Sequence, residues 1–507
     1  MHLSALLDSA VRSGGTKEAV VHREQRWTYR EFGAATRRAA TVLHDAGVRA
    51  GDRLAVMTYN TPAFLFAAFG AWHLGATLVP VNHKLQTDEV ARQLAHCGAR
   101  VALVDAEIGG RATAADPGVR WLISHPDAPA EALPADSFEA LLATAAPWIG
   151  EAEGRPDTDV AEILYTSGTS GTPKGCVHSH RTAALTAAYS AATMSMRADD
   201  RFLICMPIWH AAPLNNMTLG TLFAGGTVVL QREYEPRGML EIIQRERVTA
   251  LFGAPIALIA PTQAVPDFAD YDVSSVRAWL YGAGPLDADT VRRLMKAYGT
   301  ENFQQVYGMS ETGPAGASLL PAEHADKAGA IGRGGMPGVD LRVVRPDGSD
   351  AEAGESGEIW LRTDTRMLGY LGDEAATAEV FAGDWYRSGD LGRVDEGGYV
   401  TLVDRMKDVI ITGGENVASQ EVEGALRGHP DVLDVAVVGR PHPQWGETVV
   451  AYVVPREGAG LDLAGMRGWL EERIARYKVP RELILRDALP RTPSGKITKH
   501  VLRAELA

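Results

Sequence analysis

The N-terminal part of the chain alternates short apolar runs with longer alanine-rich stretches. Short runs of apolar and β-branched residues are typical of strands, whereas longer stretches with apolar residues every three or four positions are typical of helices. The pattern predicts strands at residues 53–58, 77–81 and 101–105, with helices at 62–74 and 87–97 between them. Strands that alternate with helices in this way favour parallel sheets covered by helices.

Two later regions break this alternation. Residues 126–158 are rich in Ala, Pro, Asp and Glu, which predicts a loosely structured connection. Residues 357–361 and 399–403 resemble antiparallel strands, and the glycine pair before the second strand favours a tight turn. A compact α+β tail follows, with strands predicted at 432–438 and 449–455, a helix at 464–477 and a last helix from about 498. We therefore expect one domain over 1–404 and a second over 405–507, with a hinge near 404–408.

Length and charge narrow the class of protein. With 507 residues, the chain is long enough for two or more domains, and 46% hydrophobic with 22% charged residues is typical of a globular protein. The net charge of −14 argues against nucleic acid as a partner and against a polybasic membrane anchor. The longest apolar stretch, residues 62–81, is interrupted by Gly and Pro, so no membrane span is predicted. The oligomeric state stays open.

Cysteine usage and the N-terminus bear on location. The three cysteines, Cys97, Cys176 and Cys205, form no C-x-x-C pair and suit a reducing compartment. The first residues lack a basic segment followed by a long apolar core, so no signal peptide is predicted. Together these features predict a cytoplasmic protein.

The segment most informative about chemistry is residues 165–175, which read Tyr-Thr-Ser-Gly-Thr-Ser-Gly-Thr-Pro-Lys-Gly. Glycines let successive backbone N–H groups point into one concavity that binds anions, and the hydroxyls and Lys174 add further donors. The segment therefore predicts a loop that grips a polyphosphate, although the Walker A spacing is absent. A plain glycine-rich turn would explain the glycines but not the dense hydroxyls beside a lysine.

This loop resembles the signature loop of the adenylate-forming superfamily, which includes acyl-CoA synthetases, luciferases and the adenylation domains of peptide synthetases. Further segments resemble that family's motifs in family order, at residues 209–210, 281–285, 307–312, 386–390, 404–407 and 493–496. The resemblance implies an α/β fold. It has a large N-terminal domain of stacked β-sheets with helices, a small β-barrel-like subdomain, and a small mobile α+β C-terminal domain.

The resemblance also implies an ATP site. A carboxylate would attack the α-phosphorus of ATP, pyrophosphate would leave, and the charge on several oxygens would need cations and fixed donors around it. The implied catalytic residues are Lys496, Lys174 and Glu311, and the implied Mg²⁺ ligands are Glu311 and Thr166. The implied ATP-binding residues are Thr166, Ser167, Gly168, Thr169, Ser170, Gly171, Thr172, Lys174, Gly282, Ala283, Gly284, Tyr307, Gly308, Ser310, Asp390, Arg405 and Lys496.

The substrate pocket is less well defined by the sequence. Residues 207–216 contain no acid to meet an ammonium group, which disfavours an α-amino acid and leaves medium-chain fatty, aryl and cinnamate-type acids open. Asn215 and Asn216 either favour a substrate with a polar group or lie on the protein surface. His210 either lines the pocket or is a half-buried histidine without a chemical part. The implied pocket residues are Trp209, His210, Asn215, Asn216, Tyr281 and Gly308.

The acceptor of the acyl group is implied by segments after the hinge. Residues 410–416 and 445–447 resemble the acyl-CoA ligase branch, and paired glycines permit the close approach of a slender pantetheine arm. The expected cosubstrates are therefore ATP and CoA, with Mg²⁺. A carrier-protein thiol or a small nitrogen nucleophile is the alternative acceptor, and a non-catalytic nucleotide sensor and a luciferase-like oxidation are more distant alternatives. The implied CoA and hinge residues are Lys407, Gly413, Gly414, Glu415 and Trp445.

Overall fold

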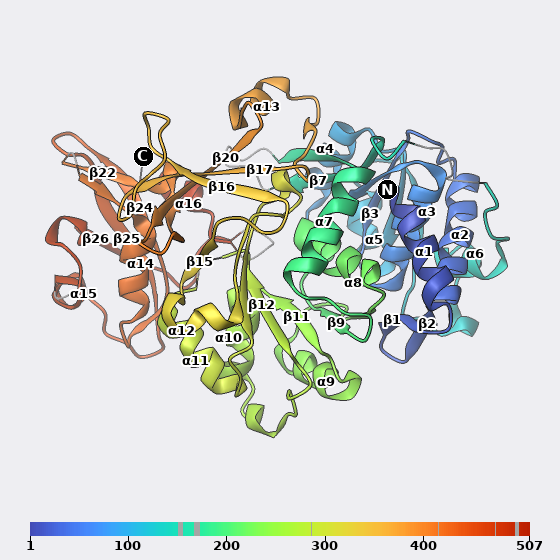
Figure 1. Cartoon of the computed structure of the whole chain (residues 1–507), viewed down its shortest axis with the longest axis horizontal. Helices are drawn as coiled ribbons and strands as arrows, with labels where there is room; N and C mark the ends of the chain where they lie inside the picture. The colour runs from blue at the N-terminus through green and yellow to red at the C-terminus, as the bar shows by residue number, and fades with distance from the viewer. Residues whose placement is uncertain are drawn as a thin grey trace. The chain divides into compact units, whose positions relative to one another are not determined.

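The computed structural model of the chain describes residues 1–150, 156–166, 173–284, 286–413, 415–471, 473–491 and 496–506 (Figure 1). The chain divides into two compact units. The first comprises Met1–Leu341 with Leu361–Tyr386, and the second comprises Arg342–Trp360 with Arg387–Ala507. Residues 342–360 and 387–404 thus group with the C-terminal residues, and the hinge expected near 404–408 stays a prediction.

Two sheets form the framework of the first unit. Among the described residues, eight strands lie in the order β14-β13-β12-β11-β9-β10-β1-β2, and seven in the order β18-β8-β7-β4-β3-β5-β6. The eight strands are β1 (Glu18–His22), β2 (Gln25–Thr28), β9 (Arg201–Ile204), β10 (Thr227–Leu230), β11 (Ala250–Gly253), β12 (Ala278–Gly282), β13 (Phe303–Tyr307) and β14 (Ala317–Leu319). The seven are β3 (Arg53–Met57), β4 (Thr77–Pro80), β5 (Val101–Asp105), β6 (Arg120–Ser124), β7 (Val160–Thr166), β8 (Lys174–Ser179) and β18 (Gly369–Tyr370).

The central strands of both sheets run parallel, as the sequence predicts. Parallel pairs join β10 to β1 and β9 in one sheet, and β3 to β4 and β5 in the other. Antiparallel pairs occur where β7 meets β8, where β8 meets β18, and at both edges of the larger sheet. The phosphate-loop segment therefore joins an antiparallel pair of strands rather than a strand and a helix.

Helices cover these sheets. They are α1 (Leu3–Gly14), α2 (Tyr29–Asp45), α3 (Pro62–Leu74), α4 (Thr87–Cys97), α5 (Ala106–Thr113), α6 (Phe138–Thr144), α7 (His180–Thr193), α8 (Gly220–Phe223), α9 (Pro236–Glu246), α10 (Pro255–Ala264), α11 (Ala288–Tyr298), α12 (His324–Lys327) and α13 (Glu374–Val380). A π-helix, η2, spans Ala212–Leu219, and the short strands β15 (Ala330–Arg333) and β19 (Phe381–Ala382) complete this unit. Helix α7 packs against β7, β8 and η2.

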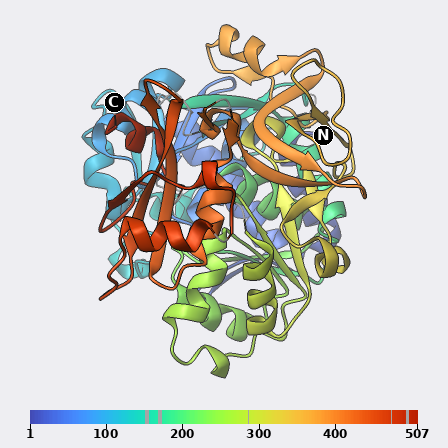
Figure 2. The same cartoon turned by 90° about the vertical axis from the view of Figure 1, so that its left-hand side faces the viewer.

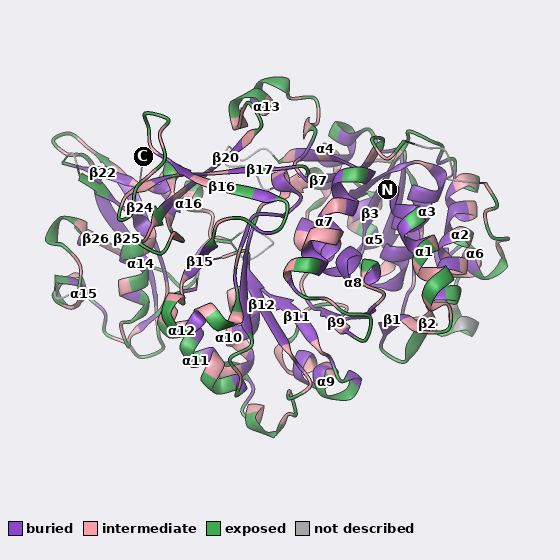
Figure 3. Ribbon diagram, viewed as in Figure 1, coloured by how far each residue is buried: buried purple, intermediate pink, exposed green. Residues whose placement is uncertain are grey.

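Helix α3 shows how the sequence specifies a core element. Pro62 stands at its first turn, where a missing N–H costs nothing, and Gly75 ends it in the left-handed conformation at φ +70°. All of its residues are buried, so the helix is apolar around its whole circumference. Figure 3 shows α3 and the strands β11 and β12 in the buried colour. No helix in the described ranges is long and apolar enough to cross a membrane.

The second unit holds most of two further sheets, and the strands β24 to β26 are coloured orange-red to red in Figure 2. One includes the order β21-β20-β17-β16, and the other has the order β23-β22-β25-β24 with β26 beside β25. The strands are β16 (Val339–Val344), β17 (Ser356–Thr363), β20 (Trp385–Val394), β21 (Tyr399–Arg405), β22 (Ile410–Thr412), β23 (Glu415–Val417), β24 (Val432–His442), β25 (Gly446–Pro455) and β26 (Glu482–Leu485). Its helices are α14 (Ser419–Arg427), α15 (Leu463–Glu471) and α16 (Lys499–Ala504).

Two sequence predictions need correction. Residues 126–158 are not simply a loose connection, because helix α6 lies within them and buries Phe138 completely, with Ser137 capping its first turn. The helix predicted at 464–477 ends earlier in the described chain, since α15 stops at Glu471 and a separate 3-10 turn covers Arg476–Lys478. The fold class is as predicted, a mixed α/β chain with a large and a small part.

Candidate active site

The predicted phosphate loop connects the strands β7 and β8. Thr166 and Lys174 are the last paired residues of this antiparallel pair, so the loop leaves one strand and returns to the next. Lys174 is half-buried at the start of β8. Neither of these two strands was among those predicted from the sequence. The predicted ligands Ser167, Gly168, Thr169, Ser170, Gly171 and Thr172 lie outside the described residues.

A tyrosine that the sequence analysis did not select links the predicted lysine and glutamate. The Nζ of Lys174 lies 4.9 Å from the ring centroid of Tyr370, and the Tyr370 hydroxyl donates a 2.9 Å hydrogen bond to Oε1 of Glu311. Burial, and then the charge of Glu311, raise the pKa of Tyr370, which therefore remains a donor. Tyr370 is placed by pairing with Cys176 on β8. Its separation of 59 residues from Glu311 leaves no local sequence signal for this contact.

The turn that carries Glu311 is held from two sides. Glu311 lies in a 3-10 turn, η4, over Ser310–Thr312. Buried His178 on β8 donates from Nε2 to the Ser310 carbonyl at 2.8 Å, and the Thr365 hydroxyl donates to the Thr312 carbonyl at 2.6 Å. Burial lowers the pKa of His178 to about 4, so the ring is neutral at physiological pH. These contacts fix the base of the Glu311 side chain.

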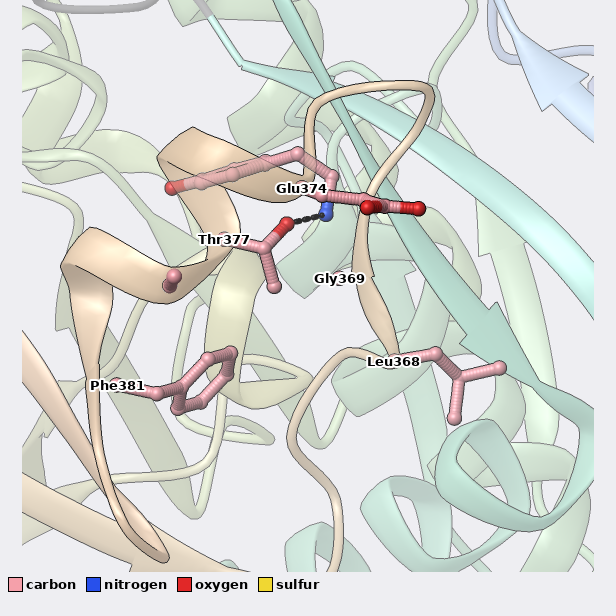
Figure 4. A pocket seen from close by; sticks show the side chains of 7 residues that line it. Leu368, Gly369, Glu374, Thr377 and Phe381 are labelled. Atoms are coloured by element: carbon pink, nitrogen blue, oxygen red, sulfur yellow. Dashed lines mark hydrogen bonds between the residues drawn. The ribbon is translucent and has the colours of Figure 1, made fainter.

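Tyr370 lines a cavity, and Figure 4 labels five of the residues around it. Thr377 on α13 accepts a 2.9 Å hydrogen bond from the backbone N–H of Tyr370, so the cavity wall supports the strand β18. None of the predicted substrate-pocket residues lines it. The lining residues are Leu368, Gly369, Tyr370, Glu374, Thr377, Ala378 and Phe381.

The two predicted glycine segments bring backbones close together at the ends of β12 and β13. A Cβ on Gly282 would lie 2.3 Å from the Val306 carbonyl oxygen, and one on Gly308 would lie 2.5 Å from that of Pro314. Ala283 adopts φ +61°, a conformation that is rare for a residue with a Cβ. Backbone strain of this kind is concentrated at functional sites. Gly284 follows at the same strand end.

The aromatic residues of these segments differ in their surroundings. Tyr281 lies in the hydrophobic core of the larger sheet, and its hydroxyl contacts Nε2 of His324 at 3.0 Å. The place of Tyr281 in the substrate pocket stays a prediction. Tyr307 is buried at the end of β13, immediately before Gly308.

The predicted acid-pocket residues fall into an aromatic group and an amide group. The rings of Trp209 and His210 lie 3.6 Å apart, and Nε1 of Trp209 donates to Nδ1 of His83 at 3.2 Å. Burial lowers the pKa of His83 to about 4, which keeps this ring a neutral acceptor. His83 in turn lies against Tyr59, with 4.6 Å between ring centroids. His210 is half-buried, which is compatible with either of its two predicted roles.

Asn215 and Asn216 are buried, which corrects the alternative that they lie on the surface. Both belong to η2. The Nδ2 of Asn215 donates to Oε1 of Glu162 at 2.5 Å, and that of Asn216 donates to the Pro314 carbonyl at 3.0 Å. Both amide oxygens lack a hydrogen-bond partner in the described part of the chain. The π-helix therefore presents a polar inner wall beside the turn of Glu311.

The second unit carries the predicted ribose and hinge residues. Asp390 and Arg405 face each other on β20 and β21, with 2.6 Å between Oδ1 of Asp390 and Nε of Arg405. Asp390 is buried, while Arg405 is partly exposed. Lys407 lies in a short 3-10 turn directly after β21. The buried carboxylate is thus held in the middle of β20 by an arginine at the end of β21.

The predicted CoA segment and catalytic lysine also lie in this unit. The backbone N–H of Gly413 donates to the Trp445 carbonyl at 2.8 Å. The Trp445 ring stacks on His442 at 4.4 Å, and the guanidinium carbon of Arg481 lies 3.3 Å from the Trp445 ring centroid. Glu415 begins β23, Lys496 is exposed, and Gly414 lies outside the described residues.

Comparisons with known proteins identify the family. Residues 7–371 match the AMP-binding enzyme family, and residues 421–496 match the AMP-binding enzyme C-terminal domain. The chain belongs to the AMP-binding enzyme family, so its expected place in the adenylate-forming superfamily is confirmed. A feruloyl-CoA synthase of Amycolatopsis sp is 37% identical over 98% of this chain and 95% of its own length. An indoleacetate–CoA ligase of Aromatoleum aromaticum is 36% identical over 100% of this chain and 98% of its own.

Solved structures agree with this placement. ATP-bound MatB from Rhodopseudomonas palustris has a TM-score of 0.89 at 30% identity, covering 99% of this chain and 98% of its own. The amide bond synthetase McbA from Marinactinospora thermotolerans has a TM-score of 0.84 at 31% identity, covering 99% of each chain. The acid–CoA ligase branch that the sequence predicted is thus confirmed by the relatives, and the fold by the structures.

Proposed function

We propose that this protein joins a carboxylic acid to coenzyme A in two steps, with an acyl-adenylate between them. The observation that carries the proposal is the Lys174–Tyr370–Glu311 cluster at the base of the phosphate loop, in a chain of the AMP-binding enzyme family. In the first step the carboxylate oxygen bonds to the α-phosphorus of ATP and pyrophosphate leaves. In the second step the thiol of CoA attacks the acyl carbon, and AMP leaves.

The first step concentrates negative charge, and the residues of the cluster meet that charge. Lys174 lies beside the loop and would contact the leaving phosphates. Lys496, from the second unit, would neutralise charge at the α-phosphate. Glu311 offers a carboxylate with one oxygen already held by Tyr370, a donor type suited to Mg²⁺, and Thr166 would add a hydroxyl. Bound Mg²⁺ would offset charge on the phosphate oxygens.

The nucleoside would be held by a carboxylate and an aromatic ring. Asp390 can accept hydrogen bonds from the two ribose hydroxyls, with Arg405 as its charged neighbour. Tyr307 offers a flat face for adenine beside the backbone at Gly282 and Gly308. Ser310 stands next to Glu311, near the expected α-phosphate. For the second step, the pantetheine arm would pass Gly413 and Trp445, with Lys407 as the hinge.

An aryl or cinnamate-type acid is the substrate class that the pocket favours. The adjoining rings of Trp209 and His210 suit a planar acyl group, and the buried amide oxygen of Asn216 suits a hydroxyl on it. By their names, the two similar ligases act on ferulate and indoleacetate, which are aromatic acids. Medium-chain fatty acids would fill the same space without satisfying the amide.

The test is pyrophosphate release with ATP and Mg²⁺ across fatty, aryl, hydroxyaryl and amino-aryl acids, with and without CoA. We expect turnover with an aryl acid that rises sharply with CoA and yields AMP and a thioester. Pyrophosphate release that requires the acid but does not change with CoA would support adenylation and contradict CoA as the acceptor. ATP binding without turnover of any acid in the panel would contradict the proposal that the protein is an enzyme.

A nitrogen nucleophile is the acceptor to test next. The likeness to McbA, named as an amide bond synthetase, favours this alternative over a carrier-protein thiol. Adding amines in place of CoA and analysing products by mass spectrometry separates the two reactions. An amide formed faster than the thioester would replace the CoA proposal.

We also propose that the enzyme works in the cytoplasm. The three cysteines of the chain are free and buried, which suits a reducing compartment. Fractionation of expressing cells with an antibody against the chain tests this. Recovery in the membrane pellet would contradict it.

A further inference from the structure

One fully buried carboxyl group has no part in the chemistry above. Glu162 lies in the middle of β7 with no exposed surface. Its Oε1 accepts the 2.5 Å hydrogen bond from Asn215, and its Oε2 has no hydrogen-bond partner among the described residues. Burial raises the pKa of Glu162 to about 7, which favours the protonated form near neutrality. Burying an ionisable group is unfavourable, so its presence calls for a reason.

The strand neighbours of Glu162 carry no opposite charge. Across the strand pair its partner is His178, which is neutral and donates to the Ser310 carbonyl. On the other side its strand partner is Leu78 of β4. Thr182 of α7 lies 3.4 Å from Nδ1 of His178. The carboxyl therefore has no charged strand partner, and its hydrogen bond comes from Asn215.

Three polar contacts connect this site to the elements of both predicted pockets. Asn215 ties η2 to β7, and β7 continues four residues further to Thr166 at the phosphate loop. His178 ties β8 to the turn of Glu311, and Asn216 ties η2 to Pro314 just after that turn. The π-helix, a conformation rare in proteins and frequent at functional sites, thus has two anchors. Both anchors lead to ATP-binding elements.

We propose that Glu162 is a positioning residue. Through Asn215, it fixes the position of the acid pocket on η2 relative to the phosphate loop and the Glu311 turn. The inference rests on the proposed function. It assigns Glu162 no contact with the substrate. The hydrogen bond fixes the turn that follows Trp209 and His210, and the acid carboxylate is thereby held at the right distance from the α-phosphorus. A misplacement of about 1 Å is enough to slow such a reaction strongly.

The experiment compares four variants by the kcat and KM for acid and for ATP, measured through pyrophosphate release. Glu162→Gln keeps a hydrogen-bonding group of the same size. Glu162→Met keeps the size and removes the acceptor, so the amide of Asn215 is left unpaired. The double variant Glu162→Met with Asn215→Leu removes both polar groups. Thr227→Val, which loses a buried 2.8 Å bond to Glu18 on the larger sheet, is the control for a loss of stability alone.

We expect Glu162→Met to lower kcat and to raise the KM for the acid, each about tenfold, while the KM for ATP stays within about twofold. Glu162→Gln should stay within about twofold of the wild type for both substrates. Removing both members of a buried polar pair can be nearly neutral for stability, so the double variant should regain its melting temperature but not its KM for the acid. Thr227→Val should lower the melting temperature and leave both KM values unchanged.

Two results would overturn the inference while leaving the proposed function intact. One is a double variant whose KM for the acid recovers together with its stability, because the pair would then be only structural. The other is equal loss of acid and ATP affinity in Glu162→Met. A wild-type enzyme without acid-dependent pyrophosphate release would instead remove the proposed function, and the inference with it.

Discussion

At the scale of single residues, the hydroxyl of Tyr370 is the contact most open to test. It donates to Glu311 while its ring lies next to Lys174. Tyr370→Phe keeps the ring and removes only the hydrogen bond. Because hydrogen bonds to charged groups contribute about 1.5–3 kcal/mol, we expect adenylation to slow at least tenfold. Half-saturation by Mg²⁺ should also move to higher concentration, measured by pyrophosphate release in a Mg²⁺ titration.

The matched control is Tyr234→Phe, which removes a 2.9 Å hydrogen bond to the Ala257 carbonyl on α10. It should change stability without changing the Mg²⁺ dependence. Wild-type kinetics in Tyr370→Phe would mean that Glu311 needs no such support.

Lys496 permits a separation of the two half-reactions. Lys496→Ala should lower the rate of adenylation by about a hundredfold or more, since one charge at the α-phosphate is lost. Its rate of thioester formation from a supplied acyl-adenylate should stay near that of the wild type. Stopped-flow or quench measurements of each half-reaction give the two rates. Lys296→Ala, an exposed lysine on α11, serves as control, and equal loss in both half-reactions would contradict the assignment.

The residues of the site were predictable to different degrees. Lys174 and Glu311 lie in short sequence motifs, so the residues next to them in the sequence indicate their chemistry. Tyr370 and Glu162 could not be found in this way, because their importance comes from contacts with residues 59 and 53 positions away. An isolated buried glutamate in an apolar run carries no signal of its partner. His178 is similar, since only the fold brings it to the Ser310 carbonyl.

At the scale of elements, Gly282 controls how closely β12 and β13 approach. A Cβ there would lie 2.3 Å from the Val306 carbonyl, closer than real Cβ contacts allow, and the obstacle is backbone rather than a flexible side chain. We expect Gly282→Ala to cost about 1–3 kcal/mol of unfolding free energy by overpacking. The KM for ATP should rise because the strand end carrying Tyr307 shifts. Chemical denaturation and pyrophosphate release measure the two effects.

Gly110→Ala is the control for this substitution. Gly110 lies in α5, where no heavy atom of the described chain comes within 4 Å of an added methyl group, so alanine should fit and favour the helix by about 0.5–1 kcal/mol. Destabilisation of the two variants by the same amount would contradict the steric argument.

The elements themselves were predictable where periodicity was strong. Helix α3 begins and ends where Pro62 and Gly75 place its limits. Helix α6 was missed because its surroundings are rich in proline and acidic residues, and the burial of Phe138 depends on tertiary packing. Neither strand of the pair β7–β8 was predicted, and for β8 the reason is that the motif before it contains glycines and a proline.

At the scale of the whole chain, each compact unit comprises two separate stretches of the sequence rather than one continuous stretch. The strand pair β20–β21 joins residues before and after position 395. The Ser419 hydroxyl donates a 2.6 Å hydrogen bond to buried Asp404, so residues on both sides of position 404 belong to the same unit. Compactness is decided by such long-range pairs, which no composition change marks. The hinge near 404–408 is a prediction about rotation, and compactness does not test it.

Buried histidines predict how the whole chain responds to acid. Burial lowers the pKa values of His73, His83 and His178 to about 4, against about 6.5 in the unfolded chain. Between pH 6.5 and 4 the unfolded state therefore binds more protons, and stability falls as the pH falls. Each histidine removes about 2 kcal/mol between pH 8 and pH 5. The Glu162 carboxyl opposes this, because its pKa is raised to about 7 and the folded state binds the extra proton between pH 7 and 4.5.

The destabilising effect of the three histidines at low pH is larger than the stabilising effect of Glu162. The unfolding free energy should therefore decrease from pH 8 to pH 5. His83→Asn should make that decrease smaller, whereas Glu162→Gln should make it larger, since the opposing effect of Glu162 is gone. Urea unfolding at intervals of pH measures both slopes, with exposed His500→Asn as the control. The dependence of the unfolding free energy on pH should change in opposite directions in the two variants, because His83 gains its proton more readily in the unfolded state and Glu162 in the folded state. A change in the same direction would contradict these pKa shifts.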